Sequence, residues 1–219
     1  TWHHDDGFTY LVDTSKSMFP GNLDASTFQG TICVYDVNGG WLGASIIYDP
    51  NLDNSFNDSF AIAAGGTASY HMSKVYDYFN NTHNWKSADN AGGVLQLLIN
   101  DVILDNGDNA CCVNPNLFIF GAGGSQLYNL TAGLDVMAHE YSHGITQSSS
   151  NLVYQYQPGA LNESMSDVFG VSVDNANWTL GEIIIKPNPY GATAMRSLAD
   201  PHNGQPTTSP YWQPAHMSE

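Results

Sequence analysis

The sequence predicts an α+β fold in which a β-rich N-terminal region is followed by long helices. Over the first sixty positions, short runs of β-branched and aromatic residues alternate with turn signals such as Pro20-Gly21 and Asn38-Gly39-Gly40. After Ala61 the apolar residues recur at helical spacing instead. The 219 residues are enough to bury a substantial core in one or two domains.

Each element of this fold is predicted from its own local pattern. Thr131 is a plausible N-cap for a helix that continues to Thr146, and Pro158-Gly159 opens the helix after it. No internal repeat is visible, and the chain becomes rich in loops and proline after Gly181. The predicted strands are residues 8–12, 31–35, 41–48, 93–104 and 117–120, and the predicted helices are residues 61–82, 131–146 and 161–173.

The charge balance excludes two classes of partner. The chain has 5 Lys and Arg against 21 Asp and Glu, a formal net charge of −16. Nucleic-acid phosphates and anionic membrane surfaces both need a basic face, so neither is an expected partner. The longest apolar runs are far shorter than the roughly 20 residues of a membrane-spanning helix. The acidity itself suits calcium binding, and it equally suits simple solubility.

Three cysteines, Cys33, Cys111 and Cys112, are too few for a disulfide scaffold. Either of the adjacent pair could bridge to Cys33, or all three could be reduced and buried. The few lysines, the 21 glycines and the 12 tyrosines favour an extracellular protein.

The segment His139-Glu140-Tyr141-Ser142-His143 fits the pattern H-E-x-x-H on a predicted helix. Residues four apart lie on one helical face, so both imidazoles can point at one metal ion. Glu140 is then adjacent to the metal and can take a proton from bound water. The alternative is a pair of surface histidines.

A third ligand on the next predicted helix favours the metal site. Glu163 follows His143 by twenty residues, and two histidines with one glutamate are a known ligand set for catalytic zinc. Asp167 lies one turn beyond Glu163, where it can accept the outer N–H of a ligand histidine. A solvated or helix-capping aspartate is the alternative for Asp167.

Together, H-E-x-x-H and the later Asn162-Glu163-Ser164-Met165-Ser166-Asp167 resemble the thermolysin family of zinc metallopeptidases. Flanking segments share the resemblance, which covers residues 7–219 and is strongest from Gly107 to Pro201. They are Leu134–Ala138, Asn151–Gln155, Asp77–Asn84 and Met195–Pro201.

The resemblance implies a role for each matching residue. His139, His143 and Glu163 bind one zinc ion, Glu140 is the general base, and Tyr154 stabilises the oxyanion. Asn162 and Asp167 support the zinc ligands. Asn109 and Ala110 pair with the main chain of a peptide substrate at a sheet edge, and Arg196 binds a substrate carbonyl.

The resemblance also implies calcium near the active site. Asp135, Asp174, Asn177 and Glu182 fall at the family's calcium positions. Asn177 stands where an aspartate is usual and Thr179 where a glutamate is usual, so we expect one ion at most.

The predicted organisation is a thermolysin-like fold in two parts. Residues 1–152 form a β-rich domain ending in the H-E-x-x-H helix, and residues 153–219 begin a helical C-terminal domain. The family's oxyanion histidine and the rest of that domain do not appear in this chain, so we expect a C-terminal fragment or chain to complete the fold. Cys111-Cys112 replaces an aromatic pair that commonly follows Asn-Ala.

The predicted function is that of a secreted zinc metalloendopeptidase, which hydrolyses peptide bonds through a zinc-activated water. The alternative is a non-catalytic acidic metal-binding or adhesion module derived from the same fold. A structural zinc site is disfavoured because such sites usually have four protein ligands, and no cysteine lies near the motif.

Overall fold

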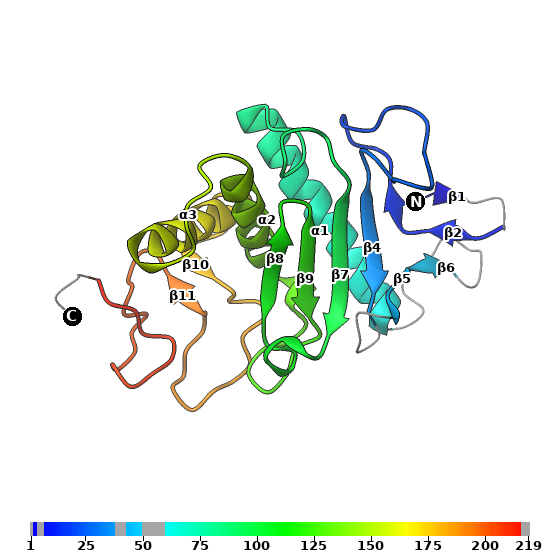
Figure 1. The fold of residues 1–219 in the computed structure, drawn as a ribbon. Helices are drawn as coiled ribbons and strands as arrows, with labels where there is room; N and C mark the ends of the chain where they lie inside the picture. Colours follow the sequence, from blue (N-terminus) through cyan, green and yellow to red (C-terminus); the bar gives the residue numbers. More distant parts are fainter. Residues whose placement is uncertain (1, 4–6, 38–42, 50–59, 216–219) are drawn as a thin grey trace.

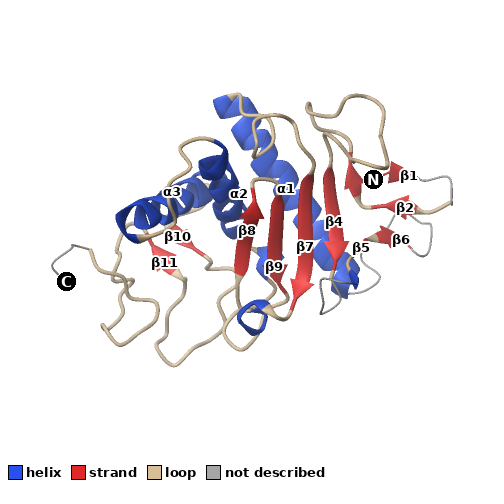
Figure 2. Cartoon of the chain, viewed as in Figure 1, coloured by secondary structure: helices blue, strands red, loops and turns tan. Residues whose placement is uncertain are grey.

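A six-stranded mixed β-sheet forms the centre of the fold (Figure 1 and Figure 2). The computed structural model describes residues 2–3, 7–37, 43–49 and 60–215. The strands lie in the order β3-β4-β7-β9-β8, and β5 pairs with β4. They are β3 (Val12–Asp13), β4 (Ile32–Asp36), β5 (Ser45–Ile46), β7 (Leu95–Asp101), β8 (Ala110–Asn114) and β9 (Leu117–Gly121).

The middle of this sheet is parallel and its far edge is antiparallel. β4, β7 and β9 run in the same direction, whereas β8 pairs antiparallel with β9 and forms the edge. β7 and β9 are rich in fully buried apolar residues, as expected for parallel strands in the interior of a sheet. The antiparallel β8 therefore leaves one strand edge free of sheet partners within the described residues.

The long helix α1 (Phe60–His83) crosses one face of the sheet (Figure 1). Its buried residues Ala68, Met72, Val75, Tyr76 and Phe79 recur at spacings of three and four, which places them on one helical face. They belong to the same core as the apolar side chains of β4, β7 and β9.

Helices α2 (Leu134–Ser148) and α3 (Tyr156–Asp174) pack closely against each other beside β8. α2 is buried from Asp135 to Gly144, which is unusual for a helix with so many polar side chains. Gly144 permits this burial: a Cβ there would lie 2.4 Å from the main-chain oxygen of Pro115. A side chain at position 144 would push α2 away from the β8–β9 turn.

Two smaller sheets and the 3₁₀ helices η2 and η3 belong to the rest of the described chain. The first sheet is three-stranded and the second joins the segments that follow α3. Their strands are β1 (Trp2–His3), β2 (Thr9–Tyr10) and β6 (Tyr48–Asp49), and β10 (Thr179–Leu180) and β11 (Arg196–Ser197). The 3₁₀ helices are η2 (Leu104–Gly107) and η3 (Leu130–Ala132).

The predicted α+β class is confirmed, and several element boundaries are corrected. Thr131 is not the cap of α2: it lies inside η3, whose cap is the side chain of Asn129, and Gly133 precedes α2. α3 begins at Tyr156 instead of residue 161, since Pro158 is tolerated in a first helical turn. β7 is shorter than the predicted strand 93–104, and part of the predicted strand 41–48 lies outside the described residues.

Two further expectations concern the membrane and the cysteines. None of the described helices has the length and apolar character needed to cross a membrane. All three cysteines are free thiols, with Cys33 buried in β4 and the other two half-buried in β8.

Candidate metal centre

Helix α2 places two imidazoles one turn apart on its inner face. His139 and His143 are both buried, and their Nε2 atoms lie 3.0 Å apart. The rings meet edge to face with their centroids 4.6 Å apart. The i and i+4 spacing of the motif therefore produces the paired geometry that the sequence predicts.

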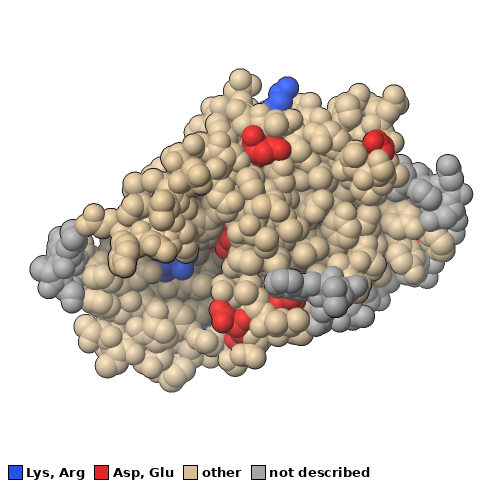
Figure 3. All heavy atoms as spheres, in the orientation of Figure 1, with Lys and Arg blue, Asp and Glu red and all other residues tan. Residues whose placement is uncertain are grey.

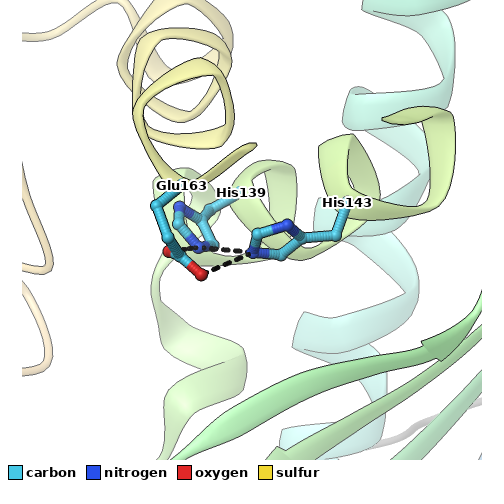
Figure 4. A group of neighbouring side chains, drawn as sticks. All are labelled: His139, His143 and Glu163. Atoms are coloured by element: carbon cyan, nitrogen blue, oxygen red, sulfur yellow. Dashed lines mark hydrogen bonds and ion pairs between the residues drawn. The ribbon is translucent and has the colours of Figure 1, made fainter. Parts of the chain in front are cut away.

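Helix α3 adds a carboxylate to this pair (Figure 4). Oε2 of Glu163 lies 3.3 Å from Nε2 of His139, and Oε1 lies 3.6 Å from Nε2 of His143. Ligand atoms about 2.05 Å from a tetrahedral zinc ion lie roughly 3.3 Å from one another. The three side chains thus have the spacing of three corners of such a site. Across the described part of the chain, no other group of three His, Cys, Asp or Glu converges in this way.

A carboxylate and a guanidinium fix the orientation of His139. Nδ1 of His139 lies 2.7 Å from Oδ1 of Asp167, and Arg196 donates to both oxygens of Asp167 at 2.7 Å each. Burial opposes the ionised carboxylate, but the contacts with His139 and Arg196 prevail and lower the pKa of Asp167 to about 2. Asp167 is therefore ionised and holds Nε2 of His139 toward the metal position.

The other ring is oriented by two residues of α3. Nδ1 of His143 lies 2.8 Å from Oδ1 of Asn162 and 3.1 Å from Oγ of Ser166. Asn162 was predicted from the sequence, but Ser166 was not. The only sequence signal for this role is that Ser166 lies one turn after Asn162. That signal is weak, because a serine in a helix most often bonds to the helix itself.

Glu140 follows the first ligand and is also buried, with 7% of its surface exposed. Burial raises the pKa of its carboxyl, and the imidazoles of His139 and His143 oppose that rise. A carboxylate with a raised pKa beside a metal position is suited to accept and return a proton near neutral pH.

The centre opens into a pocket of about 740 Å³ between β8 and α3. Asn109, Ala110, Tyr154 and Arg196, to which the family resemblance assigns substrate or oxyanion contacts, all line it. The ring of Tyr154 lies 5.9 Å from that of His143, and 62% of the Tyr154 surface is exposed. Figure 3 shows a face with few charged side chains and a hollow in which basic and acidic atoms are visible.

Much of the remaining lining was not predicted. Leu130, Val136, Leu180 and Met195 provide apolar walls, and the first three are buried core residues. They come from η3, α2 and the segments that follow α3, so no local pattern reveals that they share one pocket. Cys111 and Cys112 lie on the β8 wall as half-buried thiols.

The residues predicted to bind calcium do not converge as the metal triad does. Among the described residues, Asp135, Asp174 and Glu182 do not form a group whose ligand oxygens all come within 4.8 Å of one another. The side-chain amide of Asn177 donates a hydrogen bond from Nδ2 to Oε1 of Glu182. Calcium needs six to eight converging oxygens, which include amide and main-chain oxygens, so binding of the ion here stays a prediction of the family resemblance.

The fold and the site together define a class of protein: a mixed sheet beside two helices that carry a His₂Glu metal triad above a pocket. The comparison with family models is consistent with that class. The thermolysin metallopeptidase catalytic domain matches residues 3–147, and the alpha-helical domain of the same family matches residues 150–219. The chain therefore belongs to the thermolysin metallopeptidase family.

Named relatives are similar over most of this chain. A bacillolysin of Brevibacillus brevis is 40% identical over 168 residues, which are 76% of this chain and 29% of the relative. The neutral protease NprE of Bacillus pumilus is 41% identical over 88% of this chain and 54% of its own length. An extracellular elastase of Staphylococcus epidermidis is 36% identical over 90% of this chain and 37% of its own length.

One solved structure has a similar fold. The precursor of protealysin, a metalloproteinase from Serratia proteamaculans, matches with a TM-score of 0.69 and 27% identity. The match covers 86% of this chain and 60% of that one. The chain thus spans between about a third and a half of the curated relatives that it matches.

Proposed function

We propose that this protein is a zinc-dependent metalloendopeptidase in which His139, His143 and Glu163 hold the ion. One observation carries the proposal: Nε2 of each histidine and the carboxylate of Glu163 lie 3.0 to 3.6 Å apart, beside the buried Glu140. Two nitrogens and one carboxylate are the donor set of catalytic zinc, which keeps a fourth position open. Zinc at this position supplies Lewis acidity that polarises a carbonyl and lowers the pKa of water.

Glu140 supplies the proton transfers in this proposal. It takes a proton from water as that water attacks the peptide carbonyl, and it returns the proton to the leaving amine. The raised pKa of the Glu140 carboxyl supports this role, because it makes the carboxylate a stronger base than an ordinary glutamate. His139 must be neutral to bind a metal, whereas Asp167 and Glu163 raise the pKa of His139 to about 9 despite its burial. Metal binding therefore displaces a proton from His139.

The pocket wall supports a peptide as the substrate. β8 ends the sheet, and an extended peptide can add to such an edge through main-chain hydrogen bonds. Asn109 and Ala110 stand at the start of that edge. The phenol of Tyr154 is exposed near His143, where it can donate to a developing oxyanion. Arg196 donates two hydrogen bonds to Asp167, and its other N–H groups can reach a substrate carbonyl.

The proposal includes a boundary between two structural parts, residues 1–152 and 153–219, and further polypeptide that covers α3. The boundary lies between α2 and α3, which both contribute metal ligands. Leu161, Met165 and Val168 form an exposed apolar row on α3 at spacings of four and three. Such a row fits another helix, and this chain spans only part of its relatives.

Secretion is proposed by similarity, because one relative is called an extracellular elastase.

The decisive experiment combines metal analysis with one substitution. We expect the purified protein to hold one zinc per molecule and to cleave an internally quenched peptide. Glu140→Gln should reduce turnover by about 10² to 10⁴-fold while the zinc remains bound, since only the proton transfer is removed. Asp24→Asn, at an exposed carboxylate outside the pocket lining that accepts from Ser26, is the control and should keep its activity.

Two results would contradict the proposal. Full activity in Glu140→Gln would remove the assigned base. Zinc binding without any turnover would favour the alternative, a metal-binding module that does not catalyse.

A further inference from the structure

We infer that hydrogen bonds within the chain, in place of a calcium ion, join the first turn of α2 to the corner that follows α3. This corner is residues 174–182, from the end of α3 to the residue after β10. The inference departs from the calcium site that the family resemblance implies. It does not depend on the proposed peptidase activity.

Asp135 is the anchor on the α2 side of the contact. It is buried, with 5% of its surface exposed, and both of its oxygens have main-chain partners. Oδ1 accepts from the N–H of Val136 at 2.8 Å, and Oδ2 accepts from the N–H of Gly181. Gly181 has φ +78°, and a Cβ there would lie 2.6 Å from Sδ of Met195. The chain is therefore shaped to present this N–H to Asp135.

The carboxylate of Glu182 is satisfied by its own corner. Nδ2 of Asn177 donates to Oε1 of Glu182 at 2.6 Å, and Oγ1 of Thr179 lies 3.0 Å from Oε2. The amide oxygen of Asn177 accepts from the N–H of Thr179 at 2.6 Å. Asn177 and Thr179 together therefore close the corner around Glu182.

The identity of residue 177 decides what this corner needs. An aspartate in this position has no N–H to donate, and its charge would face that of Glu182 at hydrogen-bond distance. Two carboxylates so close need a cation or a shared proton. The amide of Asn177 removes one negative charge and supplies the donor, so the corner closes without an ion.

Asp174 has compensating charges from another element. Burial and the charge of Glu182 raise the pKa of its carboxyl, and His71 and Lys74 of α1 oppose that rise without cancelling it. Asp174 is thus placed toward α1 cations, whereas Glu182 is engaged within the corner. Burial, and then the charges of Glu182 and Asp174, raise the pKa of Asp135 to about 6. The three carboxylates therefore lie near one another, although they do not form a three-ligand group among the described residues.

Thermal unfolding tests the inference directly. The protein is studied in the Glu140→Gln background to prevent self-digestion, at fixed zinc, in buffer freed of calcium with a chelating resin. We expect millimolar calcium to leave the melting temperature unchanged. The double variant Asn177→Asp/Thr179→Glu should melt at a lower temperature without calcium and recover when calcium is added.

Saturating calcium at a real site would raise the melting temperature by about 5 °C or more. The inference is overturned if calcium stabilises the parent protein to this degree and Glu182→Gln removes the gain. An equal gain in Glu182→Gln would place the ion elsewhere and would support the inference for this corner. If a variant does not fold, calcium binding is measured on the parent protein by equilibrium dialysis with radioactive calcium, and a lanthanide whose luminescence is excited through Trp178 reports on this corner. Calcium that binds and displaces the lanthanide overturns the inference. Absence of such binding supports it.

Discussion

At the scale of single residues, the metal centre depends on two parallel rows of side chains on α3. Glu163 and Asp167 form one row beside His139. The Glu163 carboxylate lies near Nε2 of His139, where both can bind the same metal ion, and Asp167 is the partner of Nδ1. Asn162 and Ser166 form the adjacent row and serve His143. Because residues four apart lie one above the other, one helix can both complete the site and orient each imidazole. The precision of the centre is therefore set by α3 as much as by α2.

Ser166 provides a test of this arrangement. It is fully buried, and Oγ lies 3.1 Å from Nδ1 of His143. Ser166→Ala should weaken zinc binding by about tenfold, since loss of a group that supports a ligand typically costs that much. Competition with a chromophoric chelator measures the zinc affinity without using activity.

Ser172→Ala is the matched control, because the hydroxyl of Ser172 donates to the main-chain oxygen of Val168 on the same helix. It should leave zinc affinity unchanged. Equal losses in the two variants would show that helix stability, and not the contact with His143, sets the affinity.

At the scale of elements, one carboxylate accepts several hydrogen bonds from the segment between β9 and η3. Asp108 accepts from the N–H groups of Gly124, Gln126 and Leu127 at 2.7 to 2.9 Å. Burial opposes the ionised form, but these hydrogen bonds prevail and lower the pKa of Asp108. Asp108 therefore adds to the main-chain hydrogen bonds, such as those from Gly123 to Gly107 and from Tyr128 to Ile184, that shape the loop leading to the pocket.

Asp108→Asn should lower the melting temperature by a few degrees at pH 7, because an amide replaces a charged acceptor. A carboxyl with a lowered folded pKa contributes stability above its unfolded value, near 3.8, and loses it as the pH falls through the folded value. The difference between the variant and the parent should therefore shrink below pH 3.8. Asp105→Asn, at an exposed carboxylate that accepts from Asn109, is the control and should change little at either pH.

Elements and ligands differ in how far the sequence predicts them. His139, His143 and Glu163 were predictable because helical periodicity alone sets their spacing, and the fold class followed from the change in period near Ala61. Leu130 and Met195 were not, since only tertiary packing brings η3 and the chain after α3 to one wall. Thr131 was assigned to the wrong position because a 3₁₀ turn with its own cap, Asn129, precedes the helix.

At the scale of the whole molecule, the exposed row on α3 is the surface to which the proposal assigns further polypeptide. Leu161, Met165 and Val168 are between 41 and 51% exposed on the helix that carries Glu163. A soluble protein rarely leaves an ordered apolar row uncovered beside its active site. The row and the pocket share α3, so polypeptide that packs on the row also determines how firmly Glu163 is held.

Native mass spectrometry of the purified protein tests this completion. We expect the native mass to exceed 23.7 kDa by more than the mass of the metal. Under denaturing conditions, we expect to observe either a second polypeptide or a single chain longer than 219 residues. Leu161→Asp should break that association, because a charge cannot be buried in an apolar contact without a partner. Ile103→Asp, at an exposed apolar residue outside α3, is the control and should preserve the association. A native mass of this chain with its metal alone would instead mean that α3 faces solvent, and that Glu163 is held only by its contacts with His139 and His143.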